Sequence, residues 1–392
     1  MSPSDASYSG MDRQLDIYRK GLAGQKPGLP VSVEALREVA RERATAEAFD
    51  YLDGGAGSED SVAANLEAFR RWRIVPRMLR DVSDRDMTAE LFGTRLRAPF
   101  LLAPIGVQGI LHEEGELATA RAASALDVPI VLSTVSSHSL EAVAAEMGAV
   151  ARWFQLYWPR DRVLAESFVR RAEGAGYSAI VITLDAPYLA WRERDIQHAY
   201  LPFLHADGLA NYFVDPVFRA MLARPPEEDP AGAIQKVAEL FANPQLTWED
   251  LPFLREATGL PILLKGILAP EDARRAVAEG VDGIIVSNHG GRQLDGAIAA
   301  LDALPSVVEA AGGQIPVLFD SGIRRGADLL KAVALGAAAV LLGRPFAFGL
   351  AAGGEAGVRA VLENFIADAD LTLALAGRRG FDEVDRSALV RG

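Results

Sequence analysis

Eight short runs of aliphatic and β-branched residues recur along the chain, and their order constrains the fold more than any other feature. Alanine-rich segments with apolar residues at helical spacing separate most of them, and these usually end in Gly or Asp. The runs are apolar throughout, as in parallel strands that are buried on both faces of a sheet. They are FLLAPI (100–105), PIVLST (129–134), WFQLY (153–157), AIVITL (179–184), PILLKG (261–266), GIIVSN (283–288), PVLFDSG (316–322) and AVLLGRP (339–345).

This alternation predicts a single α/β domain over residues 1–392, a (β/α)₈ barrel with an N-terminal helical extension. A doubly wound open sheet is the structural alternative, but no GxGxxG follows an early strand. Residues 32–57 predict an N-terminal helix that ends at Gly54 and Gly55. Residues 86–100 predict a β-hairpin that plugs the bottom of the barrel.

Residues 188–260 interrupt the regular spacing after the fourth strand. This insertion is rich in Pro and aromatic residues, and a long insertion at the loop face of a barrel is usually a lid or a substrate-shaping loop. A disordered spacer is the alternative. The aromatic residues in NYFVDPVF argue against it, because a spacer would not need them.

Composition excludes several classes of function. The net charge of −13 argues against nucleic-acid and anionic-membrane partners, so any anionic substrate needs local positive charge in its site. The chain has no cysteine, which removes disulfides, thiolate nucleophiles and Cys-based metal sites, and we expect no metal. The N-terminus has no apolar signal segment and no apolar stretch of transmembrane length follows, so we expect a soluble cytoplasmic protein.

Candidate site residues, most of them polar, follow all eight predicted strands, where the catalytic groups of such barrels lie. Each has a plain structural explanation, such as a helix cap or a surface ion pair, but their recurrence at every strand favours a site. They are Pro104, Ile105 and Gly106; Ser133 and Thr134; Gln155 and Tyr157; Thr183 and Asp185; Lys265; Ser287, Asn288 and His289; Asp320, Ser321, Gly322 and Arg324; Gly343 and Arg344.

Three of these groups suggest specific chemistry. The glycines and arginines after the last two strands predict a phosphate site. Lys265 is a Schiff-base former, a cationic partner for a cofactor, or a snorkelling core residue. His289 and Arg292 form a pair in which the guanidinium holds a carboxylate and the imidazole takes a proton beside it, although a helix-capping histidine is the structural alternative.

The stretches SNHGGRQLDG (287–296) and DSGIRRGADLLKAVALG (320–336) resemble the FMN-dependent α-hydroxy-acid oxidases and dehydrogenases. The resemblance covers about residues 30–380, and it implies an FMN-bearing (β/α)₈ barrel, in agreement with the strand order. Relatives form homotetramers or homo-octamers, so the resemblance also implies a homo-oligomer.

The resemblance implies roles for individual residues. It makes His289 the catalytic base, with Asp185 as its partner, and assigns the substrate carboxylate to Arg192, Arg292 and Tyr51 and the substrate hydroxyl to Tyr157. It implies that FMN contacts Pro104, Ile105, Gly106, Ser133, Gln155, Thr183, Lys265, Ser287, Asp320, Ser321, Gly322, Arg324, Gly343 and Arg344.

The resemblance also implies a reaction. Val135 stands where glycolate oxidase has tryptophan, Gly106 stands where most relatives have alanine, and four segments resemble the lactate 2-monooxygenases of the family more than the glycolate oxidases. We therefore expect oxidation of a small L-2-hydroxy acid, L-lactate, by oxygen with decarboxylation to acetate, CO₂ and water. The alternatives are a plain oxidase that releases the keto acid and hydrogen peroxide, a class I aldolase-like barrel that uses Lys265, and a catalytically silent scaffold.

Overall fold

A closed barrel of eight parallel strands forms the centre of the molecule in the computed structural model, which describes residues 9–392. Each predicted run overlaps one strand, and β6 and β8 extend one residue beyond their runs. The last strand pairs with the first, Val340 opposite Phe100, so the sheet closes and the open-sheet alternative is wrong. The strands are β4 (Phe100–Leu102), β5 (Ile130–Ser133), β6 (Arg152–Leu156), β7 (Ile180–Thr183), β8 (Ile262–Ile267), β9 (Gly283–Val286), β10 (Val317–Phe319) and β11 (Val340–Leu342).

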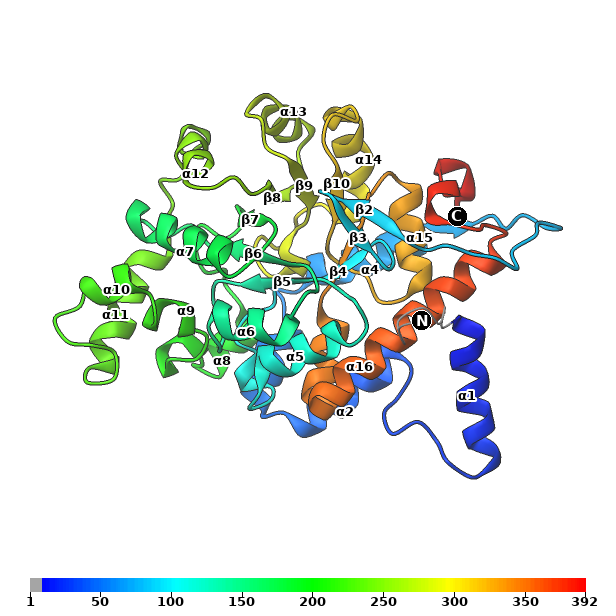
Figure 1. The fold of residues 1–392 in the computed structure, drawn as a ribbon, viewed down its shortest axis with the longest axis horizontal. Coiled ribbons are helices and arrows are strands. Elements are labelled where there is room, and N and C mark those ends of the chain that lie inside the picture. The colour runs from blue at the N-terminus through cyan, green and yellow to red at the C-terminus, as the bar shows by residue number, and fades with distance from the viewer. Residues whose placement is uncertain (1–8) are drawn as a thin grey trace.

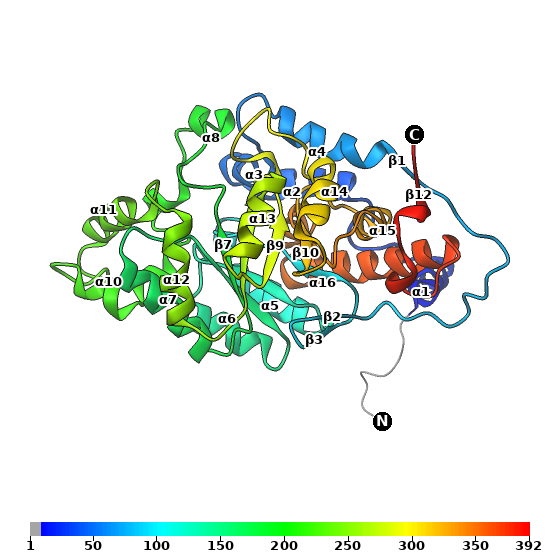
Figure 2. The same ribbon diagram turned by 90° about the horizontal axis from the view of Figure 1, so that it is seen from above.

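Eight helices surround the barrel, one after each strand (Figures 1 and 2). Side-chain caps begin several of them: Ser139 accepts a hydrogen bond from the Ala142 amide, and Asp161 accepts one from Leu164. The helices are α5 (Gly115–Ser124), α6 (Leu140–Met147), α7 (Arg162–Gly174), α12 (Leu251–Ala257), α13 (Pro270–Ala278), α14 (Ala300–Ala311), α15 (Gly326–Ala334) and α16 (Arg344–Leu375).

Side chains that alternate along the strands build two cores. One set fills the barrel and includes Leu101, Val131 and Trp153, while the other packs beneath the helices. The hairpin of β2 (Ala89–Leu91) and β3 (Thr94–Leu96) contributes buried leucines to the inner core, and its Phe92 ring lies 5.7 Å from that of Trp153. The predicted hairpin plug is therefore confirmed.

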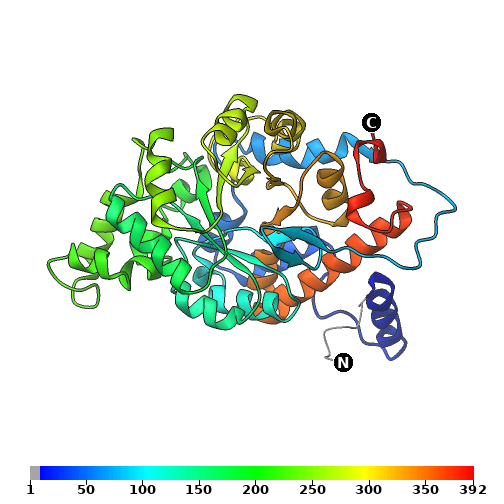
Figure 3. The same ribbon diagram turned by 45° about the horizontal axis from the view of Figure 1, so that its top comes forward.

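The insertion after β7 is largely helical, and the disordered-spacer alternative is wrong. Buried Asn211 fixes it to the barrel: its amide nitrogen donates to the Thr134 carbonyl (2.9 Å) and its oxygen accepts from the Leu140 amide (2.8 Å). Figure 3 shows the green outer helices extending from one side of the barrel. The insertion contains α8 (Glu193–Gln197), η3 (Pro202–His205), α9 (Ala210–Phe213), α10 (Pro216–Ala220), α11 (Pro230–Phe241) and η4 (Trp248–Asp250).

The N-terminal extension departs from the prediction at one point. The single helix expected over 32–57 is two helices, because Ala44 is extended and the Thr45 hydroxyl accepts a hydrogen bond from the Ala48 amide, which starts a new helix. The predicted end at Gly54 is confirmed. The extension consists of α1 (Gly10–Leu22), α2 (Val33–Arg43), α3 (Ala46–Asp53) and α4 (Asp60–Arg70).

Short elements complete the chain. The strand β1 after α4 pairs antiparallel with the C-terminal strand, Trp72 opposite Arg391. Within residues 9–392 no helix is both long enough and apolar enough to cross a bilayer. The short elements are β1 (Trp72–Ile74), η2 (Gln108–Ile110), η5 (His289–Gly291), η6 (Phe381–Glu383), η7 (Arg386–Ala388) and β12 (Leu389–Arg391).

Candidate active site

A cavity opens at the carboxyl ends of the barrel strands, and most of the predicted site residues line it. Seven do not: Asp185 and Thr183 line a neighbouring cavity, and the others are buried at the strand ends, namely Ser133, Thr134, Gln155, Ser287 and Asn288. The predicted residues that line the cavity are Tyr51, Pro104, Ile105, Gly106, Tyr157, Arg192, Lys265, His289, Arg292, Asp320, Ser321, Gly322, Arg324, Gly343 and Arg344.

His289 is held on both sides of its ring. Its Nδ1 lies 2.8 Å from a carboxylate oxygen of Asp185, and its Nε2 lies 3.4 Å from the Tyr157 hydroxyl. An ionised carboxylate only accepts hydrogen bonds, so Nδ1 carries the proton and Nε2 has a free lone pair. Burial lowers the pKa of His289, and the charge of Asp185 opposes that shift only in part. The imidazole is therefore neutral at pH 7 and able to accept a proton.

Gly266 makes this pair possible, although the sequence analysis missed it. Its φ is +110°, and a Cβ there would lie 2.8 Å from Asp185 Cβ. A side chain at this position would therefore displace the carboxylate that orients His289.

Lys265 is an ammonium ion rather than a free amine. Its Nζ lies 3.2 Å from both the Ser287 hydroxyl and a carboxylate oxygen of Asp320. Burial lowers the pKa of this lysine, but the charges of Asp185 and Asp320 more than compensate and hold it above its usual value. A Schiff-base lysine needs the opposite shift, so the geometry disfavours the aldolase-like alternative.

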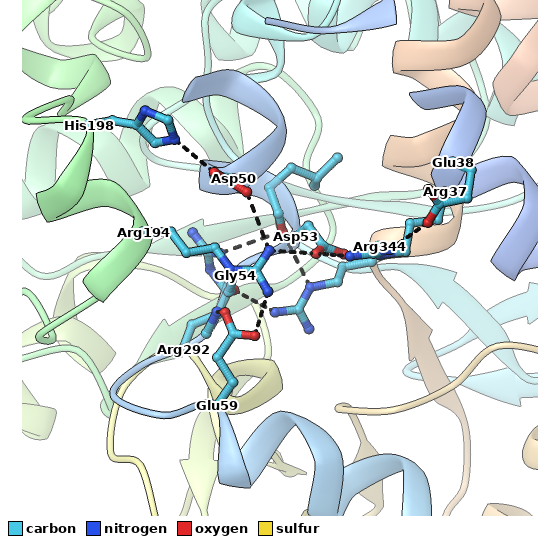
Figure 4. A network of polar contacts seen from close by, with 12 residues as sticks. Arg37, Glu38, Asp50, Asp53, Gly54, Glu59, Arg194, His198, Arg292 and Arg344 are labelled. Atoms are coloured by element: carbon cyan, nitrogen blue, oxygen red, sulfur yellow. Dashed lines mark hydrogen bonds and ion pairs between the residues drawn. The ribbon is translucent and has the colours of Figure 1, made fainter. Parts of the chain in front are cut away.

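Two arginines meet over one tyrosine ring. The guanidinium carbons of Arg292 and Arg192 lie 5.1 and 5.9 Å from the centre of the Tyr51 ring. Burial and the nearby Arg192 lower the pKa of Arg292 to about 9. Its Nη1 donates to the Gly54 carbonyl (2.8 Å, Figure 4), and no carboxylate among residues 9–392 forms an ion pair with it. A partly buried cation without an acidic partner favours an anionic ligand.

A second anion site lies at the ends of β10 and β11. Burial lowers the pKa of Arg324, and burial together with Arg324 lowers that of Arg344 to about 10. Arg344 is held by neutral carbonyls, with Nη2 donating to Gly54 and Nη1 to Gly290. Ser321 and Gly322 have positive φ and turn the backbone here. These features fit the phosphate site predicted from the sequence.

Buried polar groups line the ends of β5 and β6. The Gln155 side-chain oxygen accepts a hydrogen bond from the Ser133 hydroxyl (3.0 Å), which orients the amide. The Gln155 Nε2 is buried and has no hydrogen-bond partner within the described part of the chain. An unsatisfied buried donor costs folding free energy, so it favours a ligand with an acceptor at this place.

Gly106 and the insertion shape the remaining wall. A Cβ at Gly106 would lie 2.5 Å from the Val135 carbonyl oxygen, so Val135 fills that position and the missing methyl group leaves no open space. Phe203 and Phe241 of the insertion, which the sequence analysis did not single out, also line the cavity, and Phe241 packs 5.2 Å from the Tyr157 ring.

Comparisons with known proteins agree with this geometry. Residues 40–391 match the FMN-dependent dehydrogenase family. The chain is 46% identical over 376 residues to an L-lactate oxidase of Lysinibacillus sphaericus, with 96% of each chain covered. It is 42% identical to 2-hydroxyacid oxidase 1 of Homo sapiens, covering 88% of this chain and 91% of the relative. The crystal structure of mandelate oxidase with (S)-4-hydroxymandelic acid superposes with a TM-score of 0.82 at 44% identity, covering 93% of this chain and 99% of the other.

The family match covers residues 40–391, which include the whole barrel. A sequence identity of 46% over 376 residues is high enough to establish common family membership. The chain belongs to the FMN-dependent dehydrogenase family and is an FMN-dependent 2-hydroxy-acid oxidoreductase.

Proposed function

We propose that the protein oxidises a small L-2-hydroxy acid, L-lactate in particular, with oxygen as the electron acceptor. The observation that carries this proposal is the convergence of a neutral, carboxylate-oriented His289 with two partly buried arginines on one cavity. A base beside a carboxylate clamp is what removal of a proton from a 2-hydroxy acid requires. The aldolase-like and silent-scaffold alternatives explain neither the arginine pair nor the oriented histidine.

The buried polar groups of the barrel fit FMN. The unpartnered Gln155 amide suits a carbonyl of the flavin ring, Lys265 offers a positive charge beside it, and Arg324 and Arg344 suit the phosphate. FMN, when bound, supplies the acceptor for two electrons from the substrate and passes them to oxygen. Pro104, Ile105 and Gly106, with Ser133, Thr183 and Ser287, would complete its surroundings, together with Asp320, Ser321, Gly322 and Gly343.

The protein's own residues bind the substrate and move its proton. Arg292 and Arg192 hold the carboxylate, and Tyr157 donates a hydrogen bond to the hydroxyl oxygen. Nε2 of His289 accepts the proton, and Asp185 stabilises the resulting imidazolium through Nδ1.

The cavity wall supports a short apolar substituent on the substrate. Val135, Phe203 and Phe241 line it, and the Phe203 and Phe241 rings lie 5.8 Å apart. The L-lactate oxidase relatives, at 46% and 44% identity, support lactate. The alternative is a substrate with an aryl substituent, which the name of the relative mandelate oxidase suggests for that enzyme.

We further propose that the insertion retains the keto acid until oxygen has reacted. Lactate and O₂ then give acetate, CO₂ and water, whereas early release gives pyruvate and hydrogen peroxide. Tyr188, Leu189, Phe203 and Phe241 of the insertion all line the cavity, which supports retention.

The test is an aerobic panel of 2-hydroxy acids on the yellow, FMN-loaded protein, with products quantified with and without catalase. Acetate and CO₂ from L-lactate support the proposal. Stoichiometric pyruvate and peroxide would make the protein a plain oxidase, and turnover of mandelate but not lactate would overturn the substrate.

The pH dependence should report His289. Because burial lowers its pKa, kcat/KM should be constant above about pH 6.5, the ordinary value for imidazole, and fall as the pH drops below it and the ring becomes protonated. Initial rates at limiting substrate between pH 4.5 and 8 measure this. An acid limb centred above pH 7 would contradict a base with a lowered pKa.

Gly266→Ala should separate cofactor binding from proton transfer. The new Cβ would push the Asp185 carboxylate from Nδ1 of His289, so the imidazole would lose its orientation and kcat should fall by roughly 10²-fold or more. FMN content, read from the visible spectrum, should change little. Gly280→Ala is the control, because its φ is also positive but nothing lies within 4 Å of its Cβ position. Equal activity of the two variants would contradict this role for Gly266.

A further inference from the structure

One cluster of charges beside the cavity has no part in the proposed chemistry. Arg194 of α8 reaches three carboxylates: Nη1 lies 3.3 Å from Asp50 and 2.9 Å from Asp53, and Nη2 lies 2.6 Å from Glu59. Arg37 of α2 binds Asp53 from the other side with two hydrogen bonds of 2.7 and 2.6 Å. Figure 4 shows these side chains converging on the C-terminal end of α3.

Asp53 is the centre of this cluster. It is buried, and although burial alone would raise its pKa, Arg37, Arg344 and Arg194 hold the pKa below the usual value for an aspartate. The carboxylate is therefore ionised and is held by two cations, which also pair with the neighbouring carboxylates Asp50 and Glu59 and with Glu38. It anchors the end of α3 to α2 and α8, and its charge also acts on Arg344 and Arg324.

The same end of α3 holds the arginines that the proposed function assigns to anions. The Gly54 carbonyl, directly after Asp53, accepts hydrogen bonds of 2.8 Å from both Arg292 and Arg344 (Figure 4). The Tyr51 ring lies beneath Arg292. A shift of α3 would therefore move the carboxylate site and the phosphate site together.

The partner helix α8 holds the remaining substrate arginine. Arg192 is the N-cap residue of α8, two residues before Arg194, and its guanidinium donates to the Arg292 carbonyl (3.1 Å). The contacts of Arg194 thus fix the start of α8, and with it the place of Arg192, relative to α3.

We propose that Asp53 and Arg194 are positioning residues whose ion pair sets the spacing of Arg192, Arg292 and Arg344 and so couples substrate binding to cofactor binding. The inference rests on the proposed function for the roles of these arginines. It adds that the cluster of charged side chains at the end of α3 sets the affinities for both the substrate and FMN, rather than only stabilising the fold.

The experiment compares Asp53→Asn and Arg194→Gln with Asp370→Asn. Asp370 is also buried and also receives two hydrogen bonds of 2.7 Å from one arginine, Arg85, but its remaining hydrogen bond comes from the Gly10 amide and not from α3 or α8. It is the matched control for loss of a buried ion pair. Four quantities are measured: the dissociation constant of FMN from the apoprotein by fluorescence titration, KM and kcat for the best hydroxy acid, and the melting temperature.

Asp53→Asn should raise both KM and the FMN dissociation constant roughly 3- to 30-fold, while kcat falls less than KM rises. Arg194→Gln should raise mainly KM, because Arg37 still holds Asp53 and the lost contacts belong to α8. The double variant should show less than the sum of the two single effects, since the Asp53–Arg194 pair is lost in both single variants. Asp370→Asn should lower only the melting temperature.

The proposal would be overturned if Asp53→Asn, like Asp370→Asn, bound FMN with the affinity of the wild type. This result does not depend on turnover: a wild type that binds FMN but oxidises no 2-hydroxy acid would refute the proposed function alone. If Asp53→Asn fails to fold, Arg194→Gln decides, because Arg194 is partly exposed, and a KM equal to that of the wild type would also overturn the proposal.

Discussion

His289→Gln should slow flavin reduction by L-lactate about 10³- to 10⁴-fold and leave a yellow, FMN-loaded protein. Glutamine retains a hydrogen-bonding side chain but cannot take a proton at neutral pH. The proposed cofactor contacts lie on other side chains, among them Gln155, Lys265 and Arg344, so binding of FMN should persist.

Anaerobic rapid mixing with lactate, followed by the loss of flavin absorbance, measures this step without interference from oxygen. His205→Gln is the control, because His205 lies in the insertion, stacks on Tyr200 and does not line the cavity. It should reduce the flavin at the wild-type rate. Rates for His289→Gln within about tenfold of the wild type would remove His289 from the mechanism, because general-base catalysis contributes at least 10²-fold.

The topology of the barrel explains why His289 could be predicted from the sequence. In a closed parallel barrel every strand delivers its carboxyl end to the same rim, so residues far apart in the chain meet there. Asp185 follows β7 and His289 follows β9, and the structure places their side chains 2.8 Å apart. The strand order predicted that both residues lie at this rim, and the family resemblance predicted that they pair. The strands themselves were predictable because burial on both faces leaves uninterrupted apolar runs.

The residues that escaped the sequence analysis depend on contacts without a local pattern. Gly266 looks like an ordinary strand glycine until its φ of +110° and its distance to Asp185 are known. Asp53 and Arg194 look like surface charges on two short helices, because only the tertiary fold brings them together. The break between α2 and α3 did have a local signal, since Thr45 is a favourable N-cap residue. The alanine-rich helical pattern around it obscured that signal.

Arg292→Leu should lower kcat/KM for L-lactate by roughly 10²- to 10⁴-fold. The proposed clamp loses one or two charge-assisted hydrogen bonds to the carboxylate, each contributing about 1.5–3 kcal/mol, together with the orientation they impose. Lactamide, which has no carboxylate, provides a second measurement. The wild type should prefer lactate strongly, and the variant should lose most of that preference. A variant that still discriminates between the two as well as the wild type would place the carboxylate elsewhere.

The stability of Arg292→Leu tests whether the charge of Arg292 destabilises the folded protein. Burial and the neighbouring Arg192 lower the pKa of Arg292 to about 9, so the folded state disfavours its charge relative to the unfolded chain. Removing that charge should leave the melting temperature of the apoprotein unchanged or higher. Arg85→Leu should do the reverse. Asp370 raises the pKa of Arg85, so truncation would leave a buried carboxylate without its partner and lower the melting temperature, with no effect on kcat/KM. If both variants lost stability equally, Arg292 would be a structural residue; opposite responses would show that the fold maintains an unpaired cation for its substrate at a cost in stability.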